Sequence, residues 1–479
     1  MSSPLVEPPQ NRFSTQVGFL LNNCTGEMVV IGRADRMTRD SLAIAIEALS
    51  WMAYEGIGER TALFRAAKQL GVEEAGELRQ ANRLIMETAR FRNRLDSVVA
   101  IAIGGNEIKR TAHGVASFLR ILAYLKYVDG ASRKDLLRVV RWARDILDWR
   151  ELHPFEKAIA LLASGTVVMH RADLSEFDRL ALETCHPVWF VERTIRVFGR
   201  DFALRMLHRN LSRLPSYIRL NTLAISNADR AMKIAEQIKG SKVPKLDGIW
   251  KIQKPSDILT GTNLIQSGAL VMQDLAGIVT GLVCSVKPDQ SVLDLCAAPG
   301  NKTSHLAALM NNRGEIYSID ISDRRLAHWG SEMKRARVQI ANAIRADAAE
   351  TPIQRKVDVV LVDPPCSNTG VLAKSPSIKW RITPARVNEY AAKQYSILRA
   401  AANHVDSEGT LVYCTCSILP EENEFVIENF LRRSQEFEVV PQTPFLGSPG
   451  LRGLGQCQRF YPHLHECNGY FIAKLRRTD

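Results

Sequence analysis

Four apolar runs separated by helical patterns constrain the fold of the C-terminal half of this sequence more than any other feature. They are SVLDLCAAPGN (291–301), GEIYSID (314–320), ANAIRAD (341–347) and VDVVLVD (357–363). Each begins as a short buried strand. Strands that alternate with helices form right-handed crossovers, so we expect a parallel sheet covered by helices.

The ends of these runs carry residues suited to a nucleotide-like cofactor. The first run continues through a turn of small residues into an amphipathic helix, KTSHLAALM (302–310). Doubly wound sheets hold cofactors at such turns, at the carboxyl ends of their strands. The other three runs end at Asp320, Asp347 and Asp363. The ribose and the adenine of S-adenosylmethionine each need a hydrogen-bond acceptor, and we predict that Asp320 meets the ribose and Asp347 the adenine.

Two cysteines follow apolar, strand-like runs, Cys366 in LVDPPCS and Cys416 in LVYCTCS. Methylation of cytosine at C5 needs a soft nucleophile that first adds at C6, because the ring carbon is otherwise too poor a donor, and a thiolate supplies this. Asp363 would hold or protonate cytosine N3 as charge develops on the ring. Its structural alternative is a cap on the turn before Pro364.

From about residue 186 onward the chain resembles the Nol/Nop/Sun family of RNA cytosine-C5 methyltransferases. The segments that carry the resemblance are HPVW (186–189), IRLN (218–221), GALVMQDLAG (268–277), CAAPGNKT (296–303), DPPCSNTGVL (363–372), SIKWR (377–381), YCTCSILPEENE (413–424) and PHLHECNGYF (462–471). The resemblance implies a Rossmann-like class I methyltransferase domain, a parallel sheet with an antiparallel last strand.

The same resemblance implies roles for individual residues. Cys416 would be the nucleophile, Cys366 the residue that assists its release, and Lys302 part of the active-site motif. The implied cofactor residues are Cys296, Ala297, Ala298, Pro299, Gly300, Asn301, Lys302, Asp320, Asp347 and Asp363. DNA cytosine methyltransferases attack from the PPC cysteine instead, so Cys416 favours RNA. The base that removes the C5 proton stays open between water and Cys366.

Four positions depart from the family pattern: Asn301 and Asn368 replace glycine, Cys414 a small hydroxyl residue, and Asn468 aspartate. Asparagine tolerates a left-handed backbone, so we expect the first two to preserve their turns. For Cys414 we favour packing over chemistry, since free cysteine is among the most buried residue types.

Composition is consistent with a nucleic-acid partner in a reducing compartment. Lys and Arg outnumber Asp and Glu by 12, which suits a polyanion but also an ordinary solvated surface. Nine cysteines show no metal-ligand or disulfide spacing. The sequence has no secretory signal and no apolar run that could span a bilayer. We therefore expect a cytoplasmic monomer without a metal.

The 479 residues suggest about three domains. We expect a flexible segment over 1–36, an all-helical domain over 37–172, a small α+β domain over 186–265, and the catalytic domain over 266–479. By the resemblance, the α+β domain would be RRM-like and the helical domain NusB-like. A basic stripe in the helical domain fits either an RNA backbone track or a solvated face: Lys134, Arg138, Arg141 and Arg144, with Arg133 and Arg150 beside them.

These patterns lead to one main hypothesis and three alternatives. The main one is methylation of cytosine C5 in structured RNA with S-adenosylmethionine, on a base that is flipped out or lies in a loop. We favour rRNA over tRNA as the acceptor. The alternatives are a tRNA methyltransferase, a ribosome-assembly factor that only binds RNA, and a DNA cytosine methyltransferase. The last is opposed by Cys416 and by the absence of a large insertion after the PPC segment.

Overall fold

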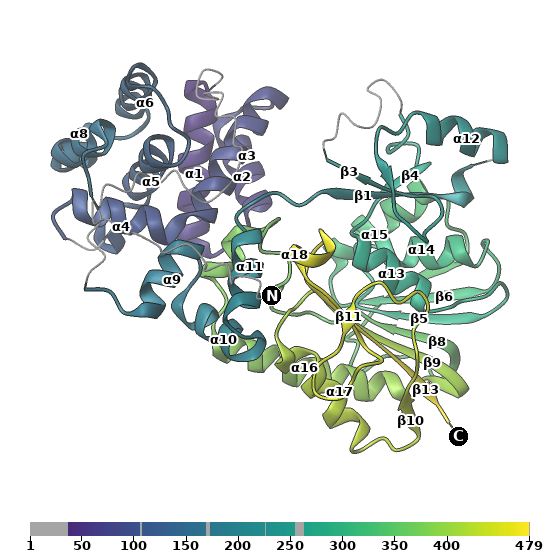
Figure 1. Ribbon diagram of the computed structural model, residues 1–479. Coiled ribbons are helices and arrows are strands. Elements are labelled where there is room, and N and C mark those ends of the chain that lie inside the picture. The colour runs from purple at the N-terminus through teal and green to yellow at the C-terminus, as the bar shows by residue number, and fades with distance from the viewer. Residues whose placement is uncertain (1–36, 106–107, 169–172, 226, 254–262, 479) are drawn as a thin grey trace, which may run out of the picture. The chain divides into compact units, whose positions relative to one another are not determined.

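The computed structural model describes residues 37–105, 108–168, 173–225, 227–253 and 263–478. The segment 1–36, for which we predict flexibility, lies outside the described residues. The described chain forms two compact units (Figure 1). Unit 1 contains residues 37–88 and 95–168, and unit 2 contains residues 89–94 and 173–478.

Unit 1 is built from helices. They are α1 (Arg39–Glu55), α2 (Glu59–Leu70), α3 (Ala75–Arg90), α4 (Arg92–Ala102), α5 (His113–Tyr127), α6 (Arg133–Ile146), α7 (Trp149–Leu152) and α8 (Glu156–Ser164), of which α3 ends and α4 begins in unit 2. The side chain of Thr38 caps α1 and that of Ser132 caps α6. The core includes Leu42 and Ile44 of α1 and Phe118 of α5, all fully buried.

Two long helical stretches are each interrupted. The stretch 72–104 forms α3 and α4, which meet at Phe91, and the guanidinium of the preceding Arg90 donates to the carbonyls of Asn210 and Ala373. The stretch 187–211 forms α10 (Val188–Phe198) and α11 (Arg200–Arg209). Gly199 separates them with φ 79° and ψ 157°, a conformation that is essentially restricted to glycine.

A small antiparallel sheet follows α9 (Glu176–Thr184), α10 and α11. Its strands are β1 (Ser216–Leu220), β2 (Ser241–Lys242), β3 (Ile249–Ile252) and β4 (Leu270–Met272), in the order β2-β3-β1-β4. Helix α12 (Ala228–Glu236) packs on this sheet through Ile234, which is buried with Ile218 and Trp250.

The large sheet is mixed, with the strand order β11-β12-β13-β9-β8-β5-β6-β7, and β10 pairs with β13 (Figure 1). Its strands are β5 (Ser291–Leu295), β6 (Glu315–Asp320), β7 (Ala341–Arg345), β8 (Val357–Val362), β9 (Val405–Thr415), β10 (Phe437–Val439), β11 (Ser448–Pro449), β12 (Gln458–Phe460) and β13 (Tyr470–Arg477). Strands β5 to β9 run parallel to their neighbours, whereas β13 is antiparallel to β9. All four predicted strands are present, and so is the antiparallel last strand.

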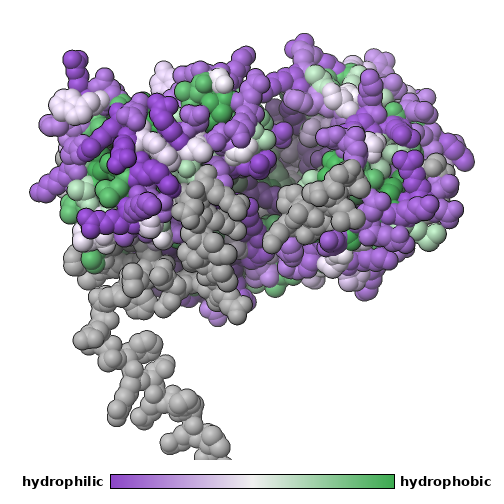
Figure 2. All heavy atoms as spheres, turned by 90° about the horizontal axis from the view of Figure 1, so that it is seen from above, coloured by the Kyte–Doolittle hydropathy of each residue, from purple (hydrophilic) through white to green (hydrophobic). Residues whose placement is uncertain are grey.

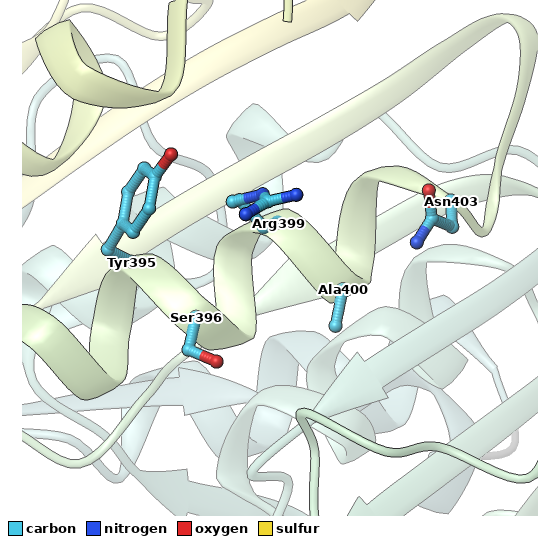
Figure 3. A pocket seen from close by; sticks show the side chains of 5 residues that line it. All are labelled: Tyr395, Ser396, Arg399, Ala400 and Asn403. Carbon is cyan, nitrogen blue, oxygen red and sulfur yellow. The ribbon is translucent and has the colours of Figure 1, made fainter. Parts of the chain in front are cut away.

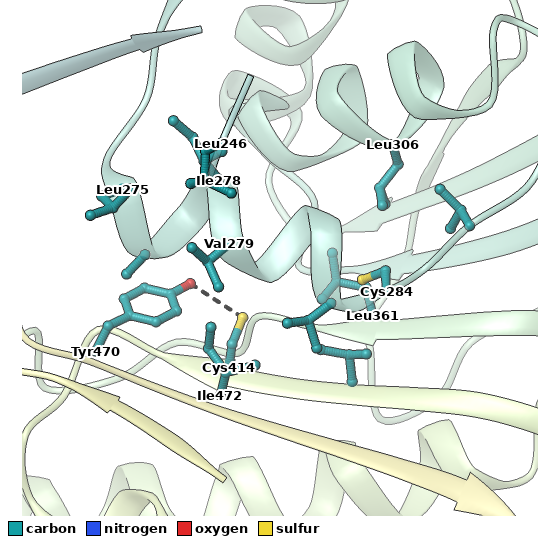
Figure 4. Packing of buried hydrophobic residues seen from close by; sticks show 14 of the residues in the cluster. Leu246, Leu275, Ile278, Val279, Cys284, Leu306, Leu361, Cys414, Tyr470 and Ile472 are labelled. Atoms are coloured by element: carbon teal, nitrogen blue, oxygen red, sulfur yellow. Dashed lines mark hydrogen bonds between the residues drawn. The ribbon is translucent and has the colours of Figure 1, made fainter. Parts of the chain in front are cut away.

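Neighbouring residues of each strand point to opposite faces of this sheet. Both faces are apolar, and helices cover each of them. Val292, Leu361 and Val412 pack with α13 (Leu275–Val283) and α14 (Asn301–Leu309). Figure 4 shows Leu361 in this cluster. The chain neighbours of these three residues pack on the other face with α16 (Pro384–Ala402) and α17 (Glu424–Leu431). Two further helices are α15 (Asp323–Ala336) and α18 (Pro462–His465). His463 and His465 lie in this last short helix, which has Pro462 in its first turn.

Candidate active site

The two predicted catalytic cysteines lie side by side at the carboxyl ends of adjacent strands. Cys366 follows β8 and Cys416 follows β9, and these strands are parallel neighbours. The Sγ atoms are 3.3 Å apart, and Cys416 Sγ donates to Asn368 Oδ1 at 2.9 Å. The hydrogen bond with Cys416 and the burial of the thiol raise the pKa of Cys366 well above its ordinary value. Cys366 is therefore a neutral thiol in contact with the more exposed Cys416.

The loop after Cys366 depends on a close backbone approach. Asn368 has a left-handed φ of 57°, and its side-chain amide donates to the Cys366 carbonyl at 2.9 Å, so the expectation that it preserves the turn is confirmed. The Gly370 amide donates to the Cys416 carbonyl at 2.8 Å. A Cβ at Gly370 would lie 2.7 Å from that carbonyl oxygen and 1.9 Å from the Gly469 oxygen, so no side chain fits.

Asp363 is paired with Lys302, which comes from the first turn of α14. Lys302 Nζ lies 2.5 Å from Asp363 Oδ2. Burial alone would lower the pKa of Lys302, but the adjacent Asp363 carboxylate reverses the effect and raises it. The ammonium group therefore stays charged beside Asp363.

Cys414, which we expected to be a packing residue, is buried but also contacts this ion pair. Its Sγ donates to Asp363 Oδ1 at 3.6 Å, and the Tyr470 hydroxyl donates to its Sγ at 3.2 Å (Figure 4). Tyr470 was not predicted as a site residue. The only available signal was its place in the NGYF segment, because nothing local links residue 470 to residue 414.

The predicted cofactor residues lie along one edge of the parallel sheet. The turn from Cys296 to Gly300 joins β5 to α14, Asp320 ends β6, and Asp347 follows β7. Asp320 is buried and accepts the amides of Ala298 and Ser322 at 3.2 and 3.1 Å. Arg325 Nη1 is 3.1 Å from the same carboxylate. Asp347 accepts the Ala349 amide at 3.0 Å and is only partly buried.

The backbone of the turn differs from our expectation at Asn301. The left-handed residues are Cys296, with φ 64°, and Gly300, with φ 105°, whereas Asn301 is the first residue of α14. The prediction of a left-handed Asn301 was therefore wrong. A residue that opens a helix needs ordinary helical dihedrals, which asparagine adopts as well as glycine does.

Asp294 is a buried acid that was not predicted as a site residue, and it lies on β5, the strand that leads into the turn. It is fully buried, accepts the Thr303 hydroxyl at 2.6 Å on Oδ2, and has no hydrogen-bond partner on Oδ1. Burial raises its pKa to about 7. The signal was present, because an acid inside the apolar run VLDL is unusual.

Other surface features do not contain the predicted site residues. A pocket on α16 is lined by Tyr395, Ser396, Arg399, Ala400 and Asn403 (Figure 3). The face in Figure 2 is mostly hydrophilic, with apolar residues in small separate patches. Among the described residues, no helix has the length and apolarity to cross a membrane, and no group of three His, Cys, Asp or Glu side chains could hold a metal ion.

Comparisons with known proteins identify relatives among RNA methyltransferases. Residues 282–476 match the family model described as 16S rRNA methyltransferase RsmB/F. The probable ribosomal RNA small subunit methyltransferase B of Bacillus subtilis (strain 168) is 31% identical over 337 residues, which cover 67% of this chain and 74% of that protein. The tRNA (cytosine(72)-C(5))-methyltransferase of Pyrococcus horikoshii is 34% identical over 261 residues, 54% of this chain and 62% of that protein.

Solved structures have the same fold. A crystal structure titled PH0851 superposes with a TM-score of 0.78 at 28% identity, over 92% of this chain and 99% of that chain. The structure of NSun6 from Pyrococcus horikoshii with SFG has a TM-score of 0.56 at 25% identity, over 61% of this chain and 98% of that chain. The resemblance inferred from the sequence motifs is confirmed.

Proposed function

This chain belongs to the RsmB/F family of RNA methyltransferases, and we propose that it methylates C5 of a cytosine in structured RNA with S-adenosylmethionine as the cofactor. The observation that carries the proposal is the 3.3 Å contact between Cys366 Sγ and Cys416 Sγ. Two thiols in contact provide both a nucleophile for C6 and a neighbour that can stabilise it when it leaves.

In the proposed reaction, Cys416 attacks C6 of the target cytosine as a thiolate. It is the more exposed of the two thiols. Cytosine N3 takes up a proton as electron density develops on the ring, and the Asp363 carboxylate accepts a hydrogen bond from this N3–H. Lys302 keeps the carboxylate oriented through the ion pair. When bound, S-adenosylmethionine supplies the electrophilic methyl group.

Release of the product depends on Cys366. A base then removes the C5 proton, and the Cys416 thiolate leaves C6. The raised pKa of Cys366 keeps this residue in its thiol form, so its S–H can donate to the departing Cys416 sulfur. In this scheme the base is water, because Cys366 in its thiol form cannot take up a second proton.

The residues at the sheet edge fit the proposed cofactor. Asp320 ends β6, Asp347 follows the neighbouring strand β7, and Asp363 follows β8 on the other side of β5. The turn of small residues after β5 lets a ligand approach the backbone closely. We propose that Asp320 holds the ribose and Asp347 the adenine. The other proposed cofactor residues are Cys296, Ala297, Ala298, Pro299, Gly300, Asn301, Lys302 and Asp363.

We also propose functions for the two other domains. The sheet order β2-β3-β1-β4 with α12 on one side supports an RRM-like platform. Its strand β4 (Leu270–Met272) lies beyond the predicted range 186–265, so this platform extends into the segment that is predicted as the catalytic domain. The helices of residues 37–172 support a NusB-like RNA-binding domain. Cytoplasmic localisation and a monomeric state stay predictions from the sequence.

The proposal is tested by bisulfite sequencing of total RNA from cells with and without the protein. We expect one or a few cytosines in small-subunit rRNA to lose protection from conversion when the protein is absent. Protection lost in a tRNA instead would make tRNA the substrate. Unchanged protection in all RNA, together with no transfer of labelled methyl to RNA by the purified protein, would contradict the proposed function.

A further inference from the structure

Glu422 is a fully buried acid that contacts the loops of both cysteines. It ends the short 3-10 helix Pro420–Glu422, close in sequence to Cys416. Its Oε2 accepts the hydroxyls of Ser367 and Ser417, each at 2.5 Å. Its Oε1 accepts the Ser367 amide at 2.8 Å. Ser367 directly follows Cys366 and Ser417 directly follows Cys416, so one carboxylate joins the residues next to both thiols.

The strand ladder does not hold the thiols in place by itself. The pairing of β8 with β9 ends at Val362 and Tyr413. Cys366 and Cys416 both lie beyond this last pair, in loops whose separation depends on other contacts. The Gly370 amide and the Thr369 hydroxyl supply two of them, by bonding to the Cys416 carbonyl and the Ser417 hydroxyl. Glu422 adds contacts from a third segment.

The Glu422 carboxylate is itself held on two sides. Gln394 of α16 donates to Glu422 Oε1 at 3.0 Å and, with the same amide nitrogen, to the Pro365 carbonyl at 3.0 Å. The Tyr413 hydroxyl donates to the Glu422 carbonyl at 2.6 Å. These contacts fix the position of the carboxylate relative to the loop of Cys366.

A neighbouring buried acid shows that this arrangement is specific to Glu422. Glu424 is also fully buried, but its carboxylate pairs with the guanidinium of Arg459. Glu422 instead accepts neutral hydroxyl and amide donors, which form short, charge-assisted hydrogen bonds to a carboxylate. Glu424 stabilises an ion pair, whereas Glu422 joins two loops.

We propose that Glu422 is a positioning residue, which holds the Cys366 and Cys416 loops in the register that brings the two thiols into contact. This inference rests on the proposed function, in which both thiols act on one cytosine. It assigns Glu422 no contact with substrate or cofactor.

The test measures thiol proximity separately from catalysis. Diamide takes two electrons and two protons from a pair of thiols, so Cys366 and Cys416 become a disulfide and diamide becomes its hydrazine. The rate is followed by mass spectrometry of the peptides that contain the two cysteines, with Cys416→Ser as the blank. We expect the rate to fall severalfold in Glu422→Gln and in the double variant Ser367→Ala, Ser417→Ala.

Turnover is measured on the same proteins. We expect kcat to fall by about 10²-fold, because a displacement of about 1 Å between reacting groups costs about that much. The KM for S-adenosylmethionine should stay within about twofold, since Glu422 is remote from the cofactor turn in sequence and in its contacts. Glu421→Gln is the matched control, because Glu421 pairs with Arg193.

The outcomes separate the two proposals. The positioning role would be overturned if Glu422→Gln and the serine double variant both form the disulfide at the wild-type rate. If Glu422→Gln does not fold, the rate of the serine double variant decides the matter. Slower disulfide formation in these variants supports the positioning role, whether or not the wild-type protein transfers a methyl group to RNA. A wild-type protein that transfers no methyl group would overturn the proposed function but not the positioning role.

Discussion

Lys302 and Asp363 form an ion pair that joins the cofactor turn to the strand that leads to Cys366. Lys302 lies in the first turn of α14 and Asp363 directly follows β8, and their charged atoms are 2.5 Å apart. The pair is mostly buried, so each charge depends on the other. A substitution at either residue should therefore disturb the position of the other side chain.

Replacing Lys302 by methionine should impair catalysis more than binding. The Asp363 carboxylate would lose the cation that orients it, and we expect kcat to fall by about 10²-fold to 10³-fold, the usual scale for a lost electrostatic contact in an active site. RNA affinity should change little. Single-turnover methyl transfer and filter binding measure the two quantities. Lys287→Met, at an exposed lysine, is the control, and an unchanged kcat in Lys302→Met would contradict the prediction.

Asp320→Ala should weaken cofactor binding by about 1.5–3 kcal/mol, the scale for a hydrogen bond to a charged group. The alanine also leaves the Ala298 and Ser322 amides without an acceptor, so Asp320→Asn, which keeps one acceptor, should lose less. Calorimetric titration with S-adenosylmethionine measures both. Asp323→Ala, an exposed acid three residues later, should bind normally. Full affinity in Asp320→Ala would exclude this residue from the cofactor site.

Asp294 should make the stability of the protein depend on pH. Its carboxyl has an ordinary pKa of 3.8 and a native pKa of about 7. Between these values the native state binds more protons than the unfolded state, so the free energy of unfolding falls as pH rises, by a few kcal/mol in total. Asp294→Asn should lose this dependence. Urea unfolding at about pH 5 and about pH 8 measures the free energy of unfolding of both proteins. If this free energy changes equally with pH in the wild type and in Asp294→Asn, the pKa shift is refuted.

The sequence predicted the parts of the site that depend on local signals. The four strand ends and the small-residue turn can be predicted from the apolar runs and from the polar or small residues that end them. Parallel pairing of β8 with β9 then brings Cys366 and Cys416 to one edge of the sheet. The bonds of Glu422 to Ser367 and of Tyr470 to Cys414 join residues 55 and 56 positions apart. No periodicity encodes such contacts, because they arise only when loops pack against each other.

The breaks between α3 and α4 and between α10 and α11 are hard to predict from the sequence for a related reason. Gly199 was visible in the sequence, but an isolated glycine is tolerated in many helices, so it did not by itself predict a break. Phe91 gives no local signal of a break. The adjacent Arg90 donates hydrogen bonds to the carbonyls of Asn210 and Ala373. Tertiary contacts of this kind override helix propensity.

The basic stripe on α6 should contribute to RNA binding through only part of its length. Arg138 pairs with Asp135 and Arg144 with Glu156, whereas Lys134 and Arg141 are exposed. If these two contact phosphates, the double variant Lys134→Ala, Arg141→Ala should reduce the slope of log affinity against log salt by about 1.8, or about 0.9 for each contact on a duplex. Methyl transfer on bound RNA should persist. A salt slope equal to that of the wild type would identify the stripe as a solvated face.

The two cysteines should behave in opposite ways when each is replaced. Cys416→Ala removes the proposed nucleophile and cannot form the bond to C6. Cys366→Ala can form this bond but loses the thiol that contacts Cys416 Sγ at 3.3 Å, so elimination slows and a protein–RNA adduct accumulates. The double variant should form no adduct. Denaturing gels with target RNA and S-adenosylmethionine measure the adduct. If Cys366 attacks instead, as in DNA cytosine methyltransferases, the pattern reverses, and an adduct in Cys416→Ala would show that Cys366 is the nucleophile.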